Sequence, residues 1–187
     1  MRLFVALDLP DETRRALGEL IERLRSECRR SRWVQPEGMH ITVKFIGHRD
    51  GTMLDAIDAA LATVRLPEAV EMRFRGLGFF PDQRRPRVAW CGVEASANLA
   101  QLAADVERRL EPLGIAPESR PFVPHLTLAR FQSAEGLENL LHAATELKRR
   151  DFGSARQTEF HLFESVLKRS GAEYKRLQTY RFRGEAA

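Results

Sequence analysis

The feature that most limits how this chain can fold is a pattern that occurs twice, once from His40 and once from His125. Residues 40–46 read His-Ile-Thr-Val-Lys-Phe-Ile, and residues 125–131 read His-Leu-Thr-Leu-Ala-Arg-Phe. Side chains alternate across a strand, so in each copy the histidine and the threonine two positions later share one face, while apolar residues share the other. We therefore expect two strands, each with one apolar face and one face that carries an imidazole and a hydroxyl.

The repetition extends beyond these two strands. The shift in numbering that places His40 on His125 also superposes other expected elements: strand 2–8 on 87–93, helix 12–30 on 97–115, and helix 53–64 on 138–149. Each half reads strand, helix, histidine strand, helix, strand. We therefore expect a single domain built by internal duplication, with sequence halves of about 1–86 and 87–187. A pseudo-twofold axis between two such lobes would place the histidine strands across a shared cleft.

The remaining elements follow from the same periodicities. Alternation predicts a strand at 69–75, and 76–87 is expected to be a break because it holds two glycines, two prolines and three arginines. Trp33 to Pro36 leads into the first histidine strand, which Gly47 is expected to end. Further helices and strands are expected as follows: helices at 99–110 and about 135–149, with Gly114 as a cap, and strands at 88–93, 160–166 and 174–182.

Composition sets the class of protein. With 187 residues, of which 43% are hydrophobic and 30% charged, the chain is expected to be an ordinary soluble globular protein. A net charge of +4 and a pI near 9.5 lean toward a polyanionic partner such as RNA. Cys28 and Cys91 lack metal or redox spacing, and no signal peptide or membrane span is found, so a cytoplasmic monomer is expected.

Two histidines that approach one small group from opposite sides suit general acid and base catalysis at a phosphate. Attack on phosphorus needs a base on the incoming side and an acid on the departing side, and imidazole serves both roles near neutral pH. Thr42 and Thr127 would donate hydrogen bonds to the non-bridging oxygens, where negative charge gathers in the transition state. The symmetry of the pattern leaves open which of His40 and His125 is the acid.

Residues near the ends of the histidine strands are further candidates. Arg130 suits a phosphate clamp, because a guanidinium forms charge-assisted hydrogen bonds to phosphate oxygens. Strict alternation puts Arg130 on the face opposite His125, so it serves only if the strand ends or twists there. For Phe45 and Phe131 core packing is the preferred interpretation, and stacking on a base is the alternative.

Other kinds of site are not indicated. Two histidines backed by threonines make a poor zinc set, and no glycine-rich nucleotide-binding motif opens a helix, so neither a metal nor a cofactor is expected. A structural role is preferred for His48, His142 and His161, which have no companion group in sequence. One His-x-Thr motif alone is weak, but two at matching positions of a duplicated unit point to function.

At this point the residues resemble a known family. The paired His-h-Thr-h motifs, in which h is apolar, are similar to those of the 2H phosphoesterases, and within them to the bacterial and archaeal RNA 2',3'-cyclic phosphodiesterases, also called 2'-5' RNA ligases. The resemblance spans almost the whole chain: Arg-Leu-Phe-Val-Ala-Leu at 2–7, His-Ile-Thr-Val-Lys-Phe-Ile-Gly at 40–47, Gly-Leu-Gly-Phe-Phe-Pro at 76–81, Pro-Arg-Val-Ala-Trp at 86–90, Pro-His-Leu-Thr-Leu-Ala-Arg at 124–130 and Glu-Ser-Val-Leu at 164–167. Neither motif departs from the family pattern.

The resemblance implies a bilobal α+β fold, with a central cleft between two antiparallel sheets and helices outside. It also implies hydrolysis of RNA 2',3'-cyclic phosphate ends, tRNA halves included, to 2'-phosphomonoesters without metal or cofactor, and reverse 2'-5' ligation at the same site. On this chain His40 would be the proton donor and His125 the proton acceptor. Thr42, Thr127 and Arg130 would hold the phosphate.

Two alternatives stay open. One is a non-enzymatic RNA-binding module, because Arg-Gly-Leu-Gly-Phe-Phe at 75–80 is similar to the RNP1 signature of RNA-recognition sheets. Against it, Leu77 replaces the first stacking aromatic, and Pro81 would interrupt a central strand. The other alternative is a 2H phosphodiesterase that acts on small cyclic nucleotides or on 2'-5' oligonucleotides, a choice that depends on binding residues outside the motifs.

Overall fold

The computed structural model describes residues 1–25, 31–65, 68–132, 137–168 and 171–182, which form two antiparallel sheets and four α-helices. The α+β class is therefore confirmed. The far end of the helix predicted at 12–30 lies outside the described residues, as do Cys28 and the start of the helix predicted at 135–149.

Every pair of neighbouring strands in both sheets is antiparallel. The first sheet has the order β3-β1-β8-β9, formed by β1 (Arg2–Leu7), β3 (Ile41–His48), β8 (Glu159–Lys168) and β9 (Gly171–Arg181). The second has the order β2-β6-β5-β4-β7, formed by β2 (Arg32–Trp33), β4 (Val70–Phe80), β5 (Val88–Ala95), β6 (His125–Arg130) and β7 (Asp151–Gln157).

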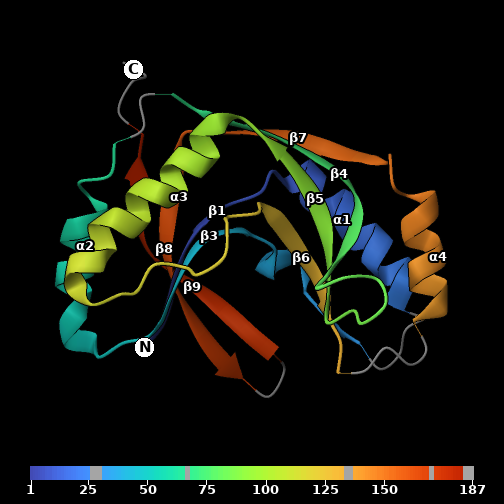
Figure 1. Ribbon diagram of the computed structural model, residues 1–187, viewed down its shortest axis with the longest axis horizontal. Coiled ribbons are helices and arrows are strands. Elements are labelled where there is room, and N and C mark those ends of the chain that lie inside the picture. The colour runs from blue at the N-terminus through green and yellow to red at the C-terminus, as the bar shows by residue number, and fades with distance from the viewer. Residues whose placement is uncertain (26–30, 66–67, 133–136, 169–170, 183–187) are drawn as a thin grey trace.

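The helices lie on the outside of the strands. They are α1 (Asp11–Arg25), α2 (Leu54–Leu61), α3 (Ala97–Leu110) and α4 (Glu138–Glu146). Figure 1 shows α2 and α3 on one side of the molecule and α1 and α4 on the other, with the strands between them. None of the helices in the described ranges is both long and apolar enough to cross a membrane.

The two sheets repeat one plan but do not coincide with the two halves of the sequence. β1 and β3 correspond to β5 and β6 when His40 is placed on His125, and each pair is hydrogen-bonded in its own sheet. β4, from the first half, joins the second sheet, whereas β8 and β9, from the second half, join the first. The halves expected at 1–86 and 87–187 are therefore interleaved, because each contributes strands to both sheets.

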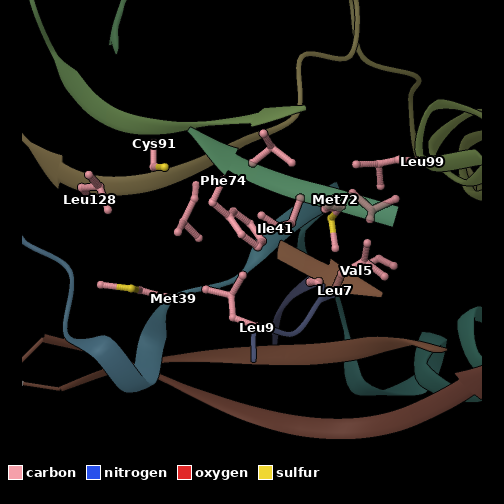
Figure 2. Close-up of a cluster of buried hydrophobic side chains, with 14 of the residues drawn as sticks. Val5, Leu7, Leu9, Met39, Ile41, Met72, Phe74, Cys91, Leu99 and Leu128 are labelled. Carbon is pink, nitrogen blue, oxygen red and sulfur yellow. The ribbon is translucent and has the colours of Figure 1, made fainter. Parts of the chain in front are cut away.

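One large apolar cluster holds residues from both sheets and from all four helices. Figure 2 shows part of it, with Val5 and Ile41 from the first sheet and Phe74, Cys91 and Leu128 from the second. Each of these five side chains is at most 1% exposed. Removal of this apolar surface from water supplies the main favourable term in folding. It also fixes the histidine strands, because their alternate residues belong to the cluster.

The break predicted at 76–87 is shorter than expected. β4 continues to Phe80, and only 81–87 connects it to β5. Gly76 has a φ of +68° at an irregularity in the pairing with β5. A Cβ on Gly78 would lie 2.2 Å from the Trp90 ring, so glycine makes room for this side chain. In this strand the glycines mark a bulge and a close approach, and not a turn.

Other boundaries also differ from the sequence prediction. β2 and β7 were not predicted: β2 has only two residues, and in β7 the buried Phe152 and Ala155 are three apart, which hides the alternation. β3 starts just after His40 and continues through Gly47 to His48. The fourth helix covers only Glu138–Glu146 within the described residues.

A buried lysine ties β3 to the segment that leads to the second histidine. The Lys44 side chain is 1% exposed, and its Nζ donates to Glu107 Oε1 on α3 and to the Ala116 carbonyl oxygen, both at 2.8 Å. Glu118 Oε1 lies 3.6 Å from the same Nζ. Burial opposes ionisation of Glu107, but the hydrogen bonds from Lys44 and from the Glu118 backbone outweigh it and lower the pKa of Glu107.

Replacement of Lys44 should therefore destabilise the fold. Lys44→Ala removes the ammonium and leaves its carboxylate partner without compensation, so we expect a loss of about 3 kcal/mol in the free energy of unfolding, measured by urea denaturation. Lys148→Ala, at an exposed position after α4, is the matched control and should change stability by less than about 0.5 kcal/mol. An unchanged urea midpoint in Lys44→Ala would contradict this role.

Candidate active site

His40 lies immediately before β3, and a backbone carbonyl fixes its ring. The 3-10 turn at Pro36–Gly38 places the Gly38 carbonyl oxygen 2.7 Å from His40 Nδ1. Since a carbonyl oxygen only accepts, Nδ1 carries the proton and Nε2 is the nitrogen left for chemistry.

His125, the first residue of β6, is held in the same way. Its Nδ1 donates to the Val123 carbonyl oxygen at 2.8 Å, again two residues earlier in the chain. The two histidines therefore share a tautomer and a local geometry as well as a sequence pattern. The side chains at 38 and 123 differ, so sequence comparison gives no sign of this bond, which uses only backbone oxygens.

The environment lowers the pKa of both rings. Burial is the largest cause in each, and it lowers the pKa of His40 to about 4 and that of His125 by less. The hydrogen bond to the carbonyl acts in the opposite direction in both. The Arg130 charge lowers the pKa of both histidines. Since Coulomb interactions weaken with distance and are screened by salt, Arg130 lies within electrostatic reach of both rings.

The two rings differ in their aromatic neighbours. The His40 ring lies 4.6 Å from Phe4 and 4.9 Å, edge-on, from Tyr174, measured between centroids. Phe4 also stacks on Phe163 at 5.2 Å, and these rings belong to a small apolar cluster separate from the main one. On the other sheet the His125 ring meets Phe80 edge-on at 4.9 Å. The first histidine is therefore enclosed by more rings, which explains its lower pKa.

A bulge in β6 decides where Arg130 lies. Trp90 pairs with Thr127 and Ala89 pairs with Ala129, so Leu128 is an extra residue in the strand. Leu128 and Ala129 are both buried, and Arg130 is exposed. The extra residue returns Arg130 to the face of Thr127. The expectation from strict alternation is therefore wrong, because alternation in sequence carries no sign of a bulge.

The same irregularity occurs in β3. Thr42 pairs with Ala6 and Lys44 pairs with Val5, so Val43 is the extra residue. Phe45 then lies on the Thr42 face and is 51% exposed. The prediction of core packing is therefore wrong for Phe45, and it is confirmed for Phe131, which is 7% exposed. When the two histidine motifs are superposed, Phe45 takes the place of Arg130, so the two lobes present an aromatic ring and a guanidinium at matching positions.

The two histidine strands meet although they belong to different sheets, since β3 and β6 are in contact. Thr42 and Thr127 are partly exposed, and each lies between two buried neighbours. The structure thus places both threonines on the face away from the apolar core, as the alternation predicts.

Arg14 of α1 holds the turn that orients His40, and sequence analysis missed it. Its Nη1 donates to the carbonyl oxygens of Pro36 at 2.6 Å and Met39 at 3.2 Å, on either side of Gly38. Its Nη2 donates to Asp8 Oδ1 at 2.6 Å. No periodicity links these positions in sequence. At the corresponding position of the second half, residue 99 is a leucine, so this clamp belongs to the first lobe alone.

The other histidines lie elsewhere. His48 is exposed at the end of β3, and His142 is exposed on α4, with Nδ1 3.8 Å from Glu146 Oε1. His161 of β8 is 1% exposed, and its Nδ1 lies 3.0 Å from Thr179 Oγ1. Among the described residues, no three His, Cys, Asp or Glu side chains gather as metal ligands.

The two antiparallel sheets of this α+β fold, each with a His-x-Thr sequence at its histidine strand, define a phosphoesterase of the 2H class. The model of the 2'-5' RNA ligase superfamily matches residues 9–168, and the chain belongs to this superfamily.

Relatives span most of the chain. An RNA 2',3'-cyclic phosphodiesterase of Aeropyrum pernix is 39% identical over 145 residues, which cover 77% of this chain and 82% of the relative. Another, from Thermus thermophilus, is 36% identical and covers 99% of this chain and 92% of the relative. A crystal structure from Thermus thermophilus matches with a TM-score of 0.80 at 32% identity, covering both chains fully. E. coli LigT complexed with 3'-AMP matches with a TM-score of 0.77 at 26% identity, covering 97% of each chain.

The Arg14 clamp predicts a catalytic defect without loss of the fold. Arg14→Lys removes the forked contact to the two carbonyls, so the Gly38 oxygen should no longer hold His40 Nδ1 firmly, and kcat should fall about tenfold or more with little change in KM. Arg15→Lys, at the exposed neighbouring position of α1, should behave as wild type. Two-dimensional NMR of the imidazole nitrogens should show a mixed His40 tautomer in Arg14→Lys, and an unchanged spectrum would rule the clamp out.

Acid should destabilise the protein through His40. The unfolded chain takes up the proton near the ordinary pKa of 6.5, whereas the folded ring does so near 4. The contribution of the neutral ring is thus complete above pH 6.5 and is lost as the pH falls through the folded value. When the pH is lowered from about 7.5 to about 5, the free energy of unfolding measured in urea should fall by roughly 2 kcal/mol because of this ring. His40→Gln should lose correspondingly less over that range, and equal losses would contradict the assignment.

Proposed function

We propose that this protein hydrolyses the 2',3'-cyclic phosphate at an RNA end to a 2'-phosphomonoester, with His40 and His125 as the acid and base. The observation that carries the proposal is the matched pair of histidines. In each, Nδ1 donates a hydrogen bond to the carbonyl oxygen two residues earlier, and the charge of Arg130 lowers the pKa of both rings. Relatives that match over most of the chain are RNA 2',3'-cyclic phosphodiesterases, which supports the substrate class.

The reaction needs one proton removed and one supplied. His125 Nε2 takes a proton from a water molecule as its oxygen attacks phosphorus, and the bond from phosphorus to O3' breaks. His40 Nε2 gives its proton to the departing O3', which becomes a hydroxyl, and the phosphate stays on O2'. The imidazoles end with their protonation states exchanged, and solvent restores them.

The difference in environment supports this assignment of roles. Burial among aromatic rings lowers the pKa of His40 more than that of His125, so protonated His40 is the stronger acid and neutral His125 the stronger base. Both rings are neutral near pH 7 in the free protein. The phosphate anion itself raises the pKa of the rings on binding, because an opposite charge favours the imidazolium. A pair that holds one proton has two forms, and the form with the proton on His40 is the reactive one, because it combines the stronger acid with the stronger base.

The other site residues hold the phosphate and the terminal nucleotide. Thr42 and Thr127 donate to the non-bridging oxygens, and Arg130 stabilises the charge that builds on them. Phe45, exposed on the Thr42 face, offers a flat ring on which the terminal base stacks. The two interleaved halves work as one domain, since the site takes a histidine and a threonine from each.

The cellular setting belongs to the same proposal. We expect a cytoplasmic monomer that acts on RNA ends such as those of tRNA halves. If the 5'-hydroxyl of a second RNA takes the place of water and attacks the cyclic phosphate, the bond from phosphorus to O3' breaks and 2'-5' ligation results. Small cyclic nucleotides or 2'-5' oligonucleotides are substrates of the second candidate function, favoured only if the protein turns them over faster than RNA ends.

Removal of either histidine should abolish most activity. On an oligonucleotide that ends in a 2',3'-cyclic phosphate, His40→Ala and His125→Ala should each slow the single-turnover rate by about two to four orders of magnitude. Chromatography against synthetic standards should identify the wild-type product as the 2'-phosphate. His142→Ala, at an exposed position of α4, is the control and should keep the wild-type rate.

Two results would overturn the proposal. A near wild-type rate in either of the first two variants would exclude the paired mechanism, and a 3'-phosphate product would reverse the leaving oxygen. RNA affinity without turnover of any cyclic or 2'-5' substrate would instead support the non-enzymatic RNA-binding module.

A further inference from the structure

Arg176 of β9 lies on the same face of the first sheet as His40. It pairs with Phe163 across β8 and β9, and residues directly opposite in antiparallel strands share a face. The Arg176 Cζ lies 5.8 Å from the centroid of the Phe163 ring, and this ring lies 6.4 Å from the His40 ring. One aromatic side chain therefore separates the guanidinium from the candidate proton donor.

Among the described residues, this guanidinium shares its one carboxylate partner with Arg14. Asp8 accepts from Arg14 through Oδ1 and from Arg176 through Oδ2, so one carboxylate serves two cations and a net positive charge remains. The Arg14 side chain is 18% exposed and also donates to backbone carbonyls. The Arg176 side chain is 45% exposed, and within the described ranges its hydrogen bonds go to Asp8 alone. A guanidinium has five N–H donors, and the bond to Asp8 uses one on Nη2. Arg176 therefore keeps N–H groups that can donate to a ligand.

The position of Arg176 is also fixed in advance. The Asp8 carboxylate and the face of the Phe163 ring hold the guanidinium from two sides. A preorganised guanidinium with free donors binds phosphate oxygens through charge-assisted hydrogen bonds at little cost in side-chain entropy. Arg130 acts on both histidines through its charge, and Arg176 is a second cationic position on the His40 side of the pair.

We propose that Arg176 binds the phosphodiester immediately 5' of the terminal cyclic phosphate, so that the site selects an RNA chain over a single nucleotide. This inference rests on the proposed function, because the terminal phosphate must lie between His40 and His125. Two successive phosphates of one RNA strand then meet Arg130 and Arg176, and a mononucleotide uses only Arg130.

The test compares substrates that differ by one nucleotide, which adds the inner phosphodiester. The kcat/KM values are measured for adenosine 2',3'-cyclic phosphate and for a dinucleotide that ends in the same cyclic nucleotide. Arg176→Gln should lower the ratio of the dinucleotide value to the mononucleotide value about tenfold, as loss of a charge-assisted hydrogen bond predicts. Arg176→Lys keeps the charge and should recover part of the ratio. Lys175→Gln, the neighbouring residue on the opposite face of β9, should keep the wild-type ratio.

A binding measurement gives a second readout that needs no turnover. The Kd of a dinucleotide with a 2'-phosphate end is measured by calorimetry over a range of salt concentrations. Loss of one phosphate contact should reduce the slope of log Kd against log salt in Arg176→Gln, because less of the binding energy is screened by salt, and should leave it unchanged in Lys175→Gln.

The outcomes separate this inference from the proposed function. If wild-type protein cleaves neither compound, the proposed function fails, and the salt slope still decides whether Arg176 contacts the inner phosphate. If Arg176→Gln lowers both kcat/KM values equally, its effect passes through Asp8 to His40, and the inference is overturned. An unchanged ratio together with an unchanged salt slope overturns it as well.

Discussion

The candidate site depends on one local constraint, the hydrogen bond from each histidine Nδ1 to the carbonyl oxygen two residues earlier. A neutral imidazole has two tautomers and a rotatable ring, and this bond selects one tautomer in both lobes. Its acceptor is a backbone atom, so the bond is independent of the side chains at Gly38 and Val123. The constraint is strengthened on one side only, where Arg14 binds the carbonyls on both sides of Gly38.

The two histidine motifs thus share one local geometry in unequal environments. His40 is enclosed by Phe4, Tyr174 and Phe163, whereas His125 meets Phe80. The deeper burial of one imidazole separates the pKa values of the pair, as the proposed division into a proton donor and a proton acceptor requires. The bulges of β3 and β6 show the same combination of like geometry and unlike groups. They place Phe45 in one strand and Arg130 in the other on the face of the threonine. A symmetric frame therefore carries an asymmetric set of groups, as an asymmetric substrate requires.

Interleaving of the two halves joins them through shared sheets and one apolar core. Each sheet contains strands from both halves, and a single apolar cluster spans both sheets. Lys44 adds a polar tie, since its ammonium joins the first histidine strand to α3 and to the segment before the second histidine strand. A site assembled from strands far apart in the chain is held by these long-range contacts, because local propensity alone does not fix its geometry.

The amino-acid sequence alone predicts the repeated motif, the α+β class, the positions of most helices and strands, and the four residues of the two His-x-Thr motifs. These follow from periodicity and residue chemistry, which are local properties of the chain. The packed structure was needed to show that Arg130 and Phe45 lie on the threonine faces, that β4, β8 and β9 join the sheet of the other half, and that Arg14 and Asp8 support the turn before the first histidine. A bulge leaves no mark on a hydrophobic pattern, and a contact between distant residues exists only once the core has packed, so neither was available to sequence analysis.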